Sequence, residues 1–214
     1  MEAWIKTEGQ TLFCPGLPGV GKTVLTSAII DRLSKSLDGL QKVGLAYIYC
    51  DRHLQAEQDA FDMGASILKQ LLERCPSIPD ELKKLHRRTP LSGPTALGDS
   101  SFEEHIPSVC TKYDRVFILI DGLDKCEQSE RDELLSLLSG LSKQSRINLF
   151  ATSRHVHGIE RQLKNAVSLE VRGTAKGVER FLGGKVGRLH HLVQQNGSLE
   201  GLILREISAA VEGK

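Results

Sequence analysis

Hydrophobic residues follow two alternating patterns along this chain. Short runs of β-branched and aromatic residues predict strands, because such side chains favour the pleated, buried positions of a sheet. These runs occupy residues 11–14, 43–50, 116–120, 147–152 and 166–171. Longer segments between the runs place apolar residues three or four positions apart, which predicts amphipathic helices. The predicted helices cover 23–37, 59–74, 102–113, 130–141 and 156–163, then 174–190 and 199–211, with a short charged helix at 80–87.

This alternation predicts an α/β fold with a mainly parallel five-stranded sheet sandwiched between helices. The strand runs are almost continuously apolar, as expected when helices cover both faces of a parallel sheet. We assign residues 1–173 to a single core and residues 174–214 to a C-terminal helical extension. The apolar stripe of the last helix reaches almost to the end of the chain, so it either packs on the core or belongs to a truncated continuation.

The turn between the first strand and the first long helix carries a phosphate-binding pattern. Residues 16–23 read Gly-Leu-Pro-Gly-Val-Gly-Lys-Thr and match GxxxxGK[ST] at every defined position. Glycines let the backbone turn its N–H groups toward phosphate oxygens, and the start of the helix adds its positive dipole end. The lysine is expected to reach the β- and γ-phosphates, and the Thr23 hydroxyl to bind Mg²⁺. The predicted nucleotide-binding residues are Gly16, Gly19, Val20, Gly21, Lys22 and Thr23.

Two acidic residues follow the most apolar strand. Asp121 comes directly after residues 116–120 and can orient Mg²⁺ beside the loop, as the acid of a Walker B segment does. The alternative is that Asp121 caps the following turn. Asp124, three residues later, is a candidate base that polarises a water facing the γ-phosphate. Its alternative role is a solvent-facing acid at the start of the next helix.

Arg154 follows the next strand and is the second candidate catalytic residue. A guanidinium there could contact the γ-phosphate and report its presence, although exposed arginines are common on protein surfaces. Trp4 either packs in the core or lies near the base. His155 and His157 lack flanking metal ligands, so we interpret them as surface or capping residues.

Composition limits the class of partner. The chain has 28 Lys and Arg against 27 Asp and Glu, which argues against a nucleic-acid or anionic-membrane surface. No apolar run approaches the roughly 18 residues of a membrane span. The five cysteines are scattered without a CxxC pair, and the N-terminus does not resemble a signal peptide. These features together predict a cytoplasmic protein.

Four ordered motifs resemble one known family. The segments TLFCPGLPGVGKT, YIYC, VFILIDGLDKC and NLFATSR resemble the NACHT module, in the nephrocystin-3-like N-terminal version of fungal proteins that often carry ankyrin repeats. The resemblance spans about residues 4–181 and implies a STAND-class P-loop ATPase whose sensor strand lies between the Walker A and Walker B strands. It also implies a regulated switch with self-association or a downstream effector, used in fungal innate recognition or incompatibility. On this resemblance Asp121 and Asp124 are the Walker B acids and Arg154 is the sensor.

The chain departs from that family in two respects. Family members commonly have an acid directly after the second Walker B Asp, where this chain has Lys125. A cation at this position is expected to slow hydrolysis while binding survives. The helical and winged-helix segments that usually follow the core are missing, as is an effector domain, so the sequence is expected to be a truncated product, a fragment or a degenerate paralogue.

The leading functional hypothesis is therefore an ATP-binding signalling switch that uses Mg²⁺ and has slow or vestigial hydrolysis. GTP remains open, although the lack of an NKxD motif favours adenine. One alternative is a small-molecule kinase, which needs an arginine-rich lid, whereas the loop at 86–100 has cationic residues only at its start. The other is a nucleotide-free scaffold. The ligand sensed, the oligomeric state and the pathway are not specified by the sequence.

Overall fold

The computed structural model describes residues 2–37, 42–80, 82–83, 101–144 and 147–172. The chain divides into a main unit, Met1–Leu17 with Lys22–Glu170, and a second unit, Pro18–Gly21 with Val171–Lys214. The helices predicted at 174–190 and 199–211 lie outside the described residues, as do the proposed extension at 174–214, the loop at 86–100 and part of the helix predicted at 80–87.

The main unit contains a five-stranded parallel sheet, as the hydrophobic pattern predicts. Its strands are β1 (Thr11–Pro15), β2 (Val43–Tyr49), β3 (Arg115–Asp121), β4 (Ile147–Ser153) and β5 (Val167–Ser168). They are ordered β2-β3-β4-β1-β5, and every neighbouring pair is parallel. Strand β4 therefore lies between β1 and β3, which confirms the arrangement implied by the family resemblance. The carboxyl ends of all three strands meet at one edge of the sheet, which is where parallel sheets carry their ligands.

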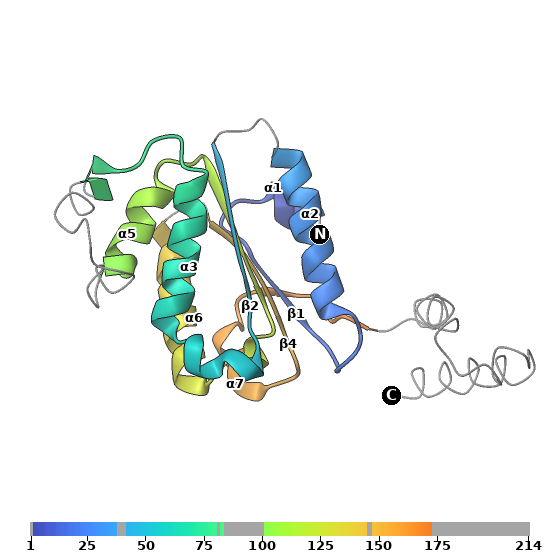
Figure 1. The fold of residues 1–214 in the computed structure, drawn as a ribbon. Coiled ribbons are helices and arrows are strands. Elements are labelled where there is room, and N and C mark those ends of the chain that lie inside the picture. Colours follow the sequence, from blue (N-terminus) through green and yellow to red (C-terminus); the bar gives the residue numbers. More distant parts are fainter. Residues whose placement is uncertain (1, 38–41, 81, 84–100, 145–146, 173–214) are drawn as a thin grey trace, which may run out of the picture. The chain divides into compact units, whose positions relative to one another are not determined.

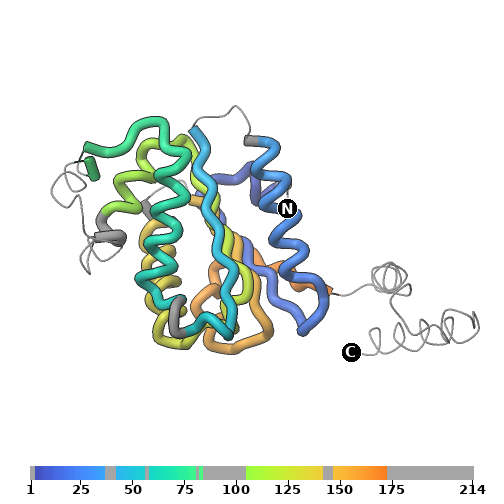
Figure 2. The backbone as a smooth tube through the Cα atoms, viewed as in Figure 1, coloured from blue at the N-terminus to red at the C-terminus, as the bar shows by residue number. Residues whose placement is uncertain are grey.

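Helices cover both faces of this sheet (Figure 1). Helix α2 (Lys22–Leu37) packs on one face, and α3 (Ala60–Glu73), α5 (Ser101–Cys110) and α6 (Gln128–Gln144) form a layer on the other. The short elements are α1 (Glu2–Lys6), η1 (Arg52–Glu57), η3 (Leu123–Lys125) and α7 (His157–Gln162). Figure 2 shows β1 running beside β4 although well over a hundred residues separate them in the chain.

Several boundaries differ from those expected from the pattern. Helix α6 is longer at both ends than predicted, and α5 ends at Cys110, before the turn that leads to β3. The last strand is only Val167–Ser168, because it pairs with two residues of β1 at an exposed edge. The short elements α1, η1 and η3 were not expected as helices, since fewer than two turns show no hydrophobic period.

The indole of Trp4 anchors the N-terminal helix to the sheet, which confirms core packing. Its side chain is 2% exposed and meets the rings of Phe117 and Phe150 edge to face, with centroids 5.5 and 6.0 Å away. The indole N–H donates to the Gln10 carbonyl over 2.8 Å. The buried Asn148 amide donates to the carbonyls of Trp4 and Thr7, each over 2.6 Å. These bonds satisfy backbone groups that the short helix leaves open.

All five cysteines are free thiols, and four of them are buried: Cys14, Cys50, Cys110 and Cys126. Burial disfavours the thiolate and raises the pKa of Cys14 to about 11 and that of Cys110 to about 12. Within the described residues, no helix is both long and apolar enough to span a bilayer.

The substitution Trp4→Ala should lower the free energy of unfolding by about 3–5 kcal/mol, since it removes a large buried ring and leaves a cavity. Urea denaturation followed by circular dichroism measures this loss. The matched control is Ile78→Ala, because Ile78 is 44% exposed and its truncation should change stability by less than about 0.5 kcal/mol. Equal effects of the two substitutions would contradict the anchoring role of Trp4.

Candidate functional site

The carboxylate of Asp121 joins three elements at the carboxyl edge of the sheet. It ends β3 and is 1% exposed. The Thr23 hydroxyl donates to Asp121 Oδ2 over 2.7 Å, and the Thr26 hydroxyl shares its one proton between Asp121 Oδ1 and the Lys22 carbonyl, each 3.0 Å away. From β4, the Thr152 hydroxyl donates to Oδ1 over 2.7 Å. The first turn of α2 and the end of β4 are therefore both fixed to the end of β3.

The direction of these hydrogen bonds leaves specific lone pairs available. Since a carboxylate only accepts, Thr23 must donate its proton to Asp121, and its oxygen lone pairs remain for another partner. Asp121 Oδ1 accepts two hydroxyls, whereas Oδ2 accepts only that of Thr23 among the contacts described. Thr152 in turn accepts the N–H of Gly122 over 2.9 Å. The Thr23 oxygen and Asp121 Oδ2 are thus oxygen ligands of the kind that Mg²⁺ prefers.

The ammonium of Lys22 closes the loop that precedes it. It donates to the carbonyls of Gly16 and Leu17 over 2.7 and 2.8 Å. The Gly16 N–H donates to the Ser153 carbonyl over 3.1 Å, which attaches the start of the loop to the end of β4. An ammonium has three donors, so at least one N–H of Lys22 is not engaged by these two carbonyls.

The glycines of the loop adopt the backbone conformation that their residue type allows. Gly19 and Gly21 have φ of 81° and 93°, the left-handed region that other residues rarely occupy. The backbone angle therefore favours glycine at both positions. Both residues and Val20 belong to the second unit.

Asp124 and Arg154 form an ion pair on the same edge. The Arg154 N–H donates to Asp124 Oδ1 over 2.9 Å, and the Arg154 Nε lies 3.1 Å from Oδ2. The second contact has the distance of an ion pair but not the angle of a hydrogen bond, so Oδ2 lacks a hydrogen-bond partner. The Asp124 side chain is only 5% exposed, whereas that of Arg154 is 47% exposed. A buried oxygen without a donor is a place where a water or ligand hydroxyl fits.

Five charged groups influence one another at this edge. The pKa of Lys22 is lowered, chiefly because partial burial disfavours its charged form. The carboxylates of Asp124 and Asp121 raise this pKa, and the cations Arg154 and Lys125 lower it. Three cations surround two carboxylates, so the site has a positive excess and suits a polyanion.

The structure brings together most of the residues singled out in the sequence. Lys22, Thr23 and Asp121 meet at one end of the sheet, and Asp124 pairs with Arg154 beside them. Two residues that hold the site were missed: Thr26 and Thr152. Their only sequence signals are a hydroxyl one helical turn after Thr23 and a polar end to an otherwise apolar strand. His155, which follows Arg154 in the chain, approaches the Glu160 carboxylate at 3.1 Å.

The sheet order, the glycine loop entering α2 and the acid at the end of β3 define the P-loop NTPase fold. The sequence profile described as "Nephrocystin 3, N-terminal" matches residues 1–154, and the chain belongs to this family. No curated protein matches the chain significantly.

Solved structures with the same core support the fold. The Aeropyrum pernix ORC1 protein, solved in complex with DNA, aligns with a TM-score of 0.54 and 16% identity, covering 84% of this chain and 44% of its own. Cdc6p from Pyrobaculum aerophilum aligns with a TM-score of 0.52 and 14% identity, covering 85% of this chain and 45% of its own. A Walker-type ATPase of Pyrococcus abyssi aligns with a TM-score of 0.51 and 16% identity, covering 95% of this chain and 63% of its own. The chain thus spans less than two thirds of each, and identities this low show the fold alone.

The turn after Asp121 depends on a glycine in the left-handed conformation, with φ of 80°. In Gly122→Ala the added Cβ would be strained and would meet the Lys125 side chain, 2.9 Å away, so stability should fall by about 1–2 kcal/mol. Gly140→Ala is the matched control: it lies in α6 with open space around it, and the same change should raise stability by about 0.5–1 kcal/mol. Denaturation curves in urea compare the two, and a loss of stability at both positions would refute this account.

Proposed function

We propose that this protein binds a nucleoside triphosphate, with ATP as the expected nucleotide, together with Mg²⁺. We further propose that it works as a NACHT-type switch of the STAND class with slow hydrolysis. In this proposal Gly16, Gly19, Val20, Gly21 and Lys22 hold the phosphates.

The observation that carries the proposal is the hydrogen bond from Thr23 to Asp121. Residues 98 positions apart meet with a 2.7 Å contact. They carry the two oxygen ligands that a P-loop site needs for its metal. A glycine-rich turn with an incidental lysine would not require a buried carboxylate at this place, because burying one is costly unless donors surround it.

Thr23 and Asp121 are the proposed metal-holding residues. When bound, Mg²⁺ neutralises charge on the phosphate oxygens and orients them. The chain's own contribution is to fix the two oxygens in advance: Thr26 and Thr152 hold the carboxylate of Asp121 in one orientation. Such preorganisation lowers the cost of ordering the site at the moment of binding.

Asp124 and Arg154 are proposed to act as base and sensor. The carboxylate of Asp124 is held by the Arg154 N–H at Oδ1, which leaves Oδ2 to accept a proton from a water. The guanidinium of Arg154 is half exposed and ion-paired with this same base. A terminal phosphate would compete for the guanidinium, so occupancy of the pocket would change the contacts of Asp124.

Lys125 supports the proposal that hydrolysis is slow. Its side chain lies over Gly122, and its positive charge contributes to lowering the pKa of Lys22. A cation beside the terminal phosphate strengthens binding of the ground state, but binding energy that is equal in ground and transition states does not raise the rate. A carboxylate at this position is absent, so Asp124 would act alone.

The remaining parts of the proposal are supported by the resemblance to the NACHT family. Residues 1–173 would form the nucleotide-binding core, and 174–214 a helical extension. Nucleotide occupancy would alter self-association or contact with an effector protein in the cytoplasm, as in fungal recognition or incompatibility. Near-equal numbers of basic and acidic residues argue against nucleic acid as the partner.

Calorimetric titration with ATP, ADP and GTP, with and without Mg²⁺, tests occupancy and base preference together. In Lys22→Ala the affinity for the triphosphate should fall about 100-fold, because charge-assisted hydrogen bonds to phosphate are lost. Lys35→Ala is the matched control, since Lys35 lies on the same helix and pairs with Asp31 at the surface. Unchanged affinity in Lys22→Ala would favour a nucleotide-free scaffold.

The base assignment is tested by Asp124→Asn, which keeps an oxygen to accept the Arg154 N–H. Triphosphate affinity should be retained, while phosphate release in single-turnover assays should fall about 100-fold or more. Asp132→Asn, the same change on α6, controls for general loss of acidity. A hydrolysis rate in Asp124→Asn equal to that of the wild type would remove Asp124 from this role.

A further inference from the structure

Strand β2 forms one edge of the described sheet, and no described strand pairs with its outer side. Its neighbour β3 lies on the other side, where Cys50 donates its N–H to the Asp121 carbonyl over 2.9 Å. Alternate residues of a strand direct their backbone groups to opposite sides. Tyr47, Tyr49 and Asp51 therefore direct theirs to the open edge.

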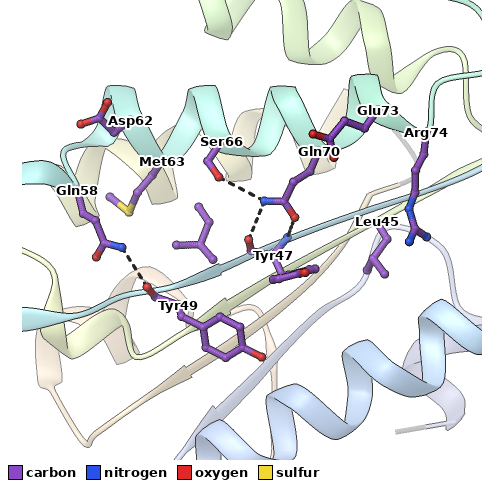
Figure 3. Close-up of a pocket in the computed structure, with 11 residues that line it drawn as sticks. Leu45, Tyr47, Tyr49, Gln58, Asp62, Met63, Ser66, Gln70, Glu73 and Arg74 are labelled. Atoms are coloured by element: carbon purple, nitrogen blue, oxygen red, sulfur yellow. Dashed lines mark hydrogen bonds between the residues drawn. The ribbon is translucent and has the colours of Figure 1, made fainter. Parts of the chain in front are cut away.

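Two glutamine side chains occupy the backbone groups of this edge (Figure 3). The Gln70 amide accepts the Tyr47 N–H over 3.0 Å and donates to the Tyr47 carbonyl over 2.9 Å. The Gln58 amide accepts the Asp51 N–H over 2.9 Å and donates to the Tyr49 carbonyl over 3.1 Å. Each amide thus uses its donor and its acceptor on the same short stretch of strand.

A side-chain amide has the same donor and acceptor groups as a peptide unit. Gln58 and Gln70 together therefore occupy the positions that the N–H and C=O groups of two residues of an adjacent strand would take. An uncovered edge strand is a template for strand addition. The glutamines satisfy this template from within the chain, through side chains that can rotate away.

A cavity of about 530 Å³ runs along β2 beside α3, so there is room for more than the glutamine side chains. Tyr47 and Tyr49 are among the residues that line it and are 39% and 37% exposed, and the Tyr49 hydroxyl lies 2.9 Å from that of Ser27 on α2. Figure 3 shows Asp62 near the Gln58 end and Glu73 near the other end. With the single cation Arg74, the described lining has two carboxylates and one guanidinium, an acidic excess.

We propose that this groove binds an extended peptide segment with basic side chains, which adds to the sheet beside β2. The incoming backbone replaces the amides of Gln58 and Gln70 at Tyr47, Tyr49 and Asp51. Its side chains occupy the cavity, where Asp62 and Glu73 attract basic groups. This site lies on β2 and α3 and does not depend on the proposed nucleotide function.

The glutamines make peptide binding an exchange of one set of hydrogen bonds for another. Since two amide caps must be displaced, affinity for a single short peptide is expected to be weak, with a Kd of about 0.1–1 mM. Removing the caps removes this competition. The double substitution Gln58→Ala with Gln70→Ala should therefore strengthen peptide binding about five- to tenfold.

The probe is an acetylated, amidated eight-residue peptide of alternating valine and lysine, titrated into the whole chain and followed by calorimetry and amide NMR. Binding should shift the amide signals of Tyr47, Tyr49 and Asp51. The control peptide has the same sequence with every backbone nitrogen methylated, which keeps its charge and removes all of its backbone donors. Gln162→Ala, the same substitution on α7 at a residue that is not among those lining the cavity, should leave affinity unchanged.

Three results would overturn the proposal. Equal binding of the methylated peptide would show simple charge attraction. Absence of binding by the unmethylated peptide to both the wild type and the double variant would show that β2 does not accept a strand. Self-association of the double variant without peptide, measured by sedimentation, would identify a second copy of this chain as the occupant. The wild-type comparison of the two peptides remains decisive if the double variant does not fold.

Discussion

A carboxylate with almost no contact with solvent, that of Asp121, determines how the ligand-facing edge of this protein is built. Burial of a carboxylate costs several kcal/mol unless donors compensate. Here the donors are hydroxyls from Thr23, Thr26 and Thr152, which belong to α2 and β4. The same contacts that keep the charge buried therefore position the helix that follows the glycine loop and the strand that precedes Arg154.

The parallel order of the sheet makes this arrangement possible. Because β4 lies between β1 and β3, the ends of three strands are neighbours, and the groups they carry converge without long connecting loops. The order also places β2 at an edge, next to β3 and away from β5. One fold thus presents two separate surfaces, a site with a positive excess at the strand ends and an acidic groove along β2.

The sequence predicted the fold class and the main participants of the site for identifiable physical reasons. The spacing of Lys22 and Thr23 after a glycine-rich turn is a local constraint, and a buried strand that ends in Asp121 is a strong signal of the acid that joins them. Thr26 and Thr152 were not predictable, because one hydroxyl in an apolar segment has many ordinary explanations. Gln58 and Gln70 gave no signal at all, since their contacts with β2 depend on how α3 packs. The extent of β5 also depended on pairing across the sheet rather than on its own residues.

The distribution of thiols gives this fold an internal set of chemical reporters. Cys14 lies on β1 just before the glycine loop, Cys50 follows β2, and Cys126 follows η3. Thiol reagents attack thiolates that they can reach, so a buried cysteine reacts only when its surroundings open. The alkylation rate at each position therefore measures how often that particular element separates from its neighbours.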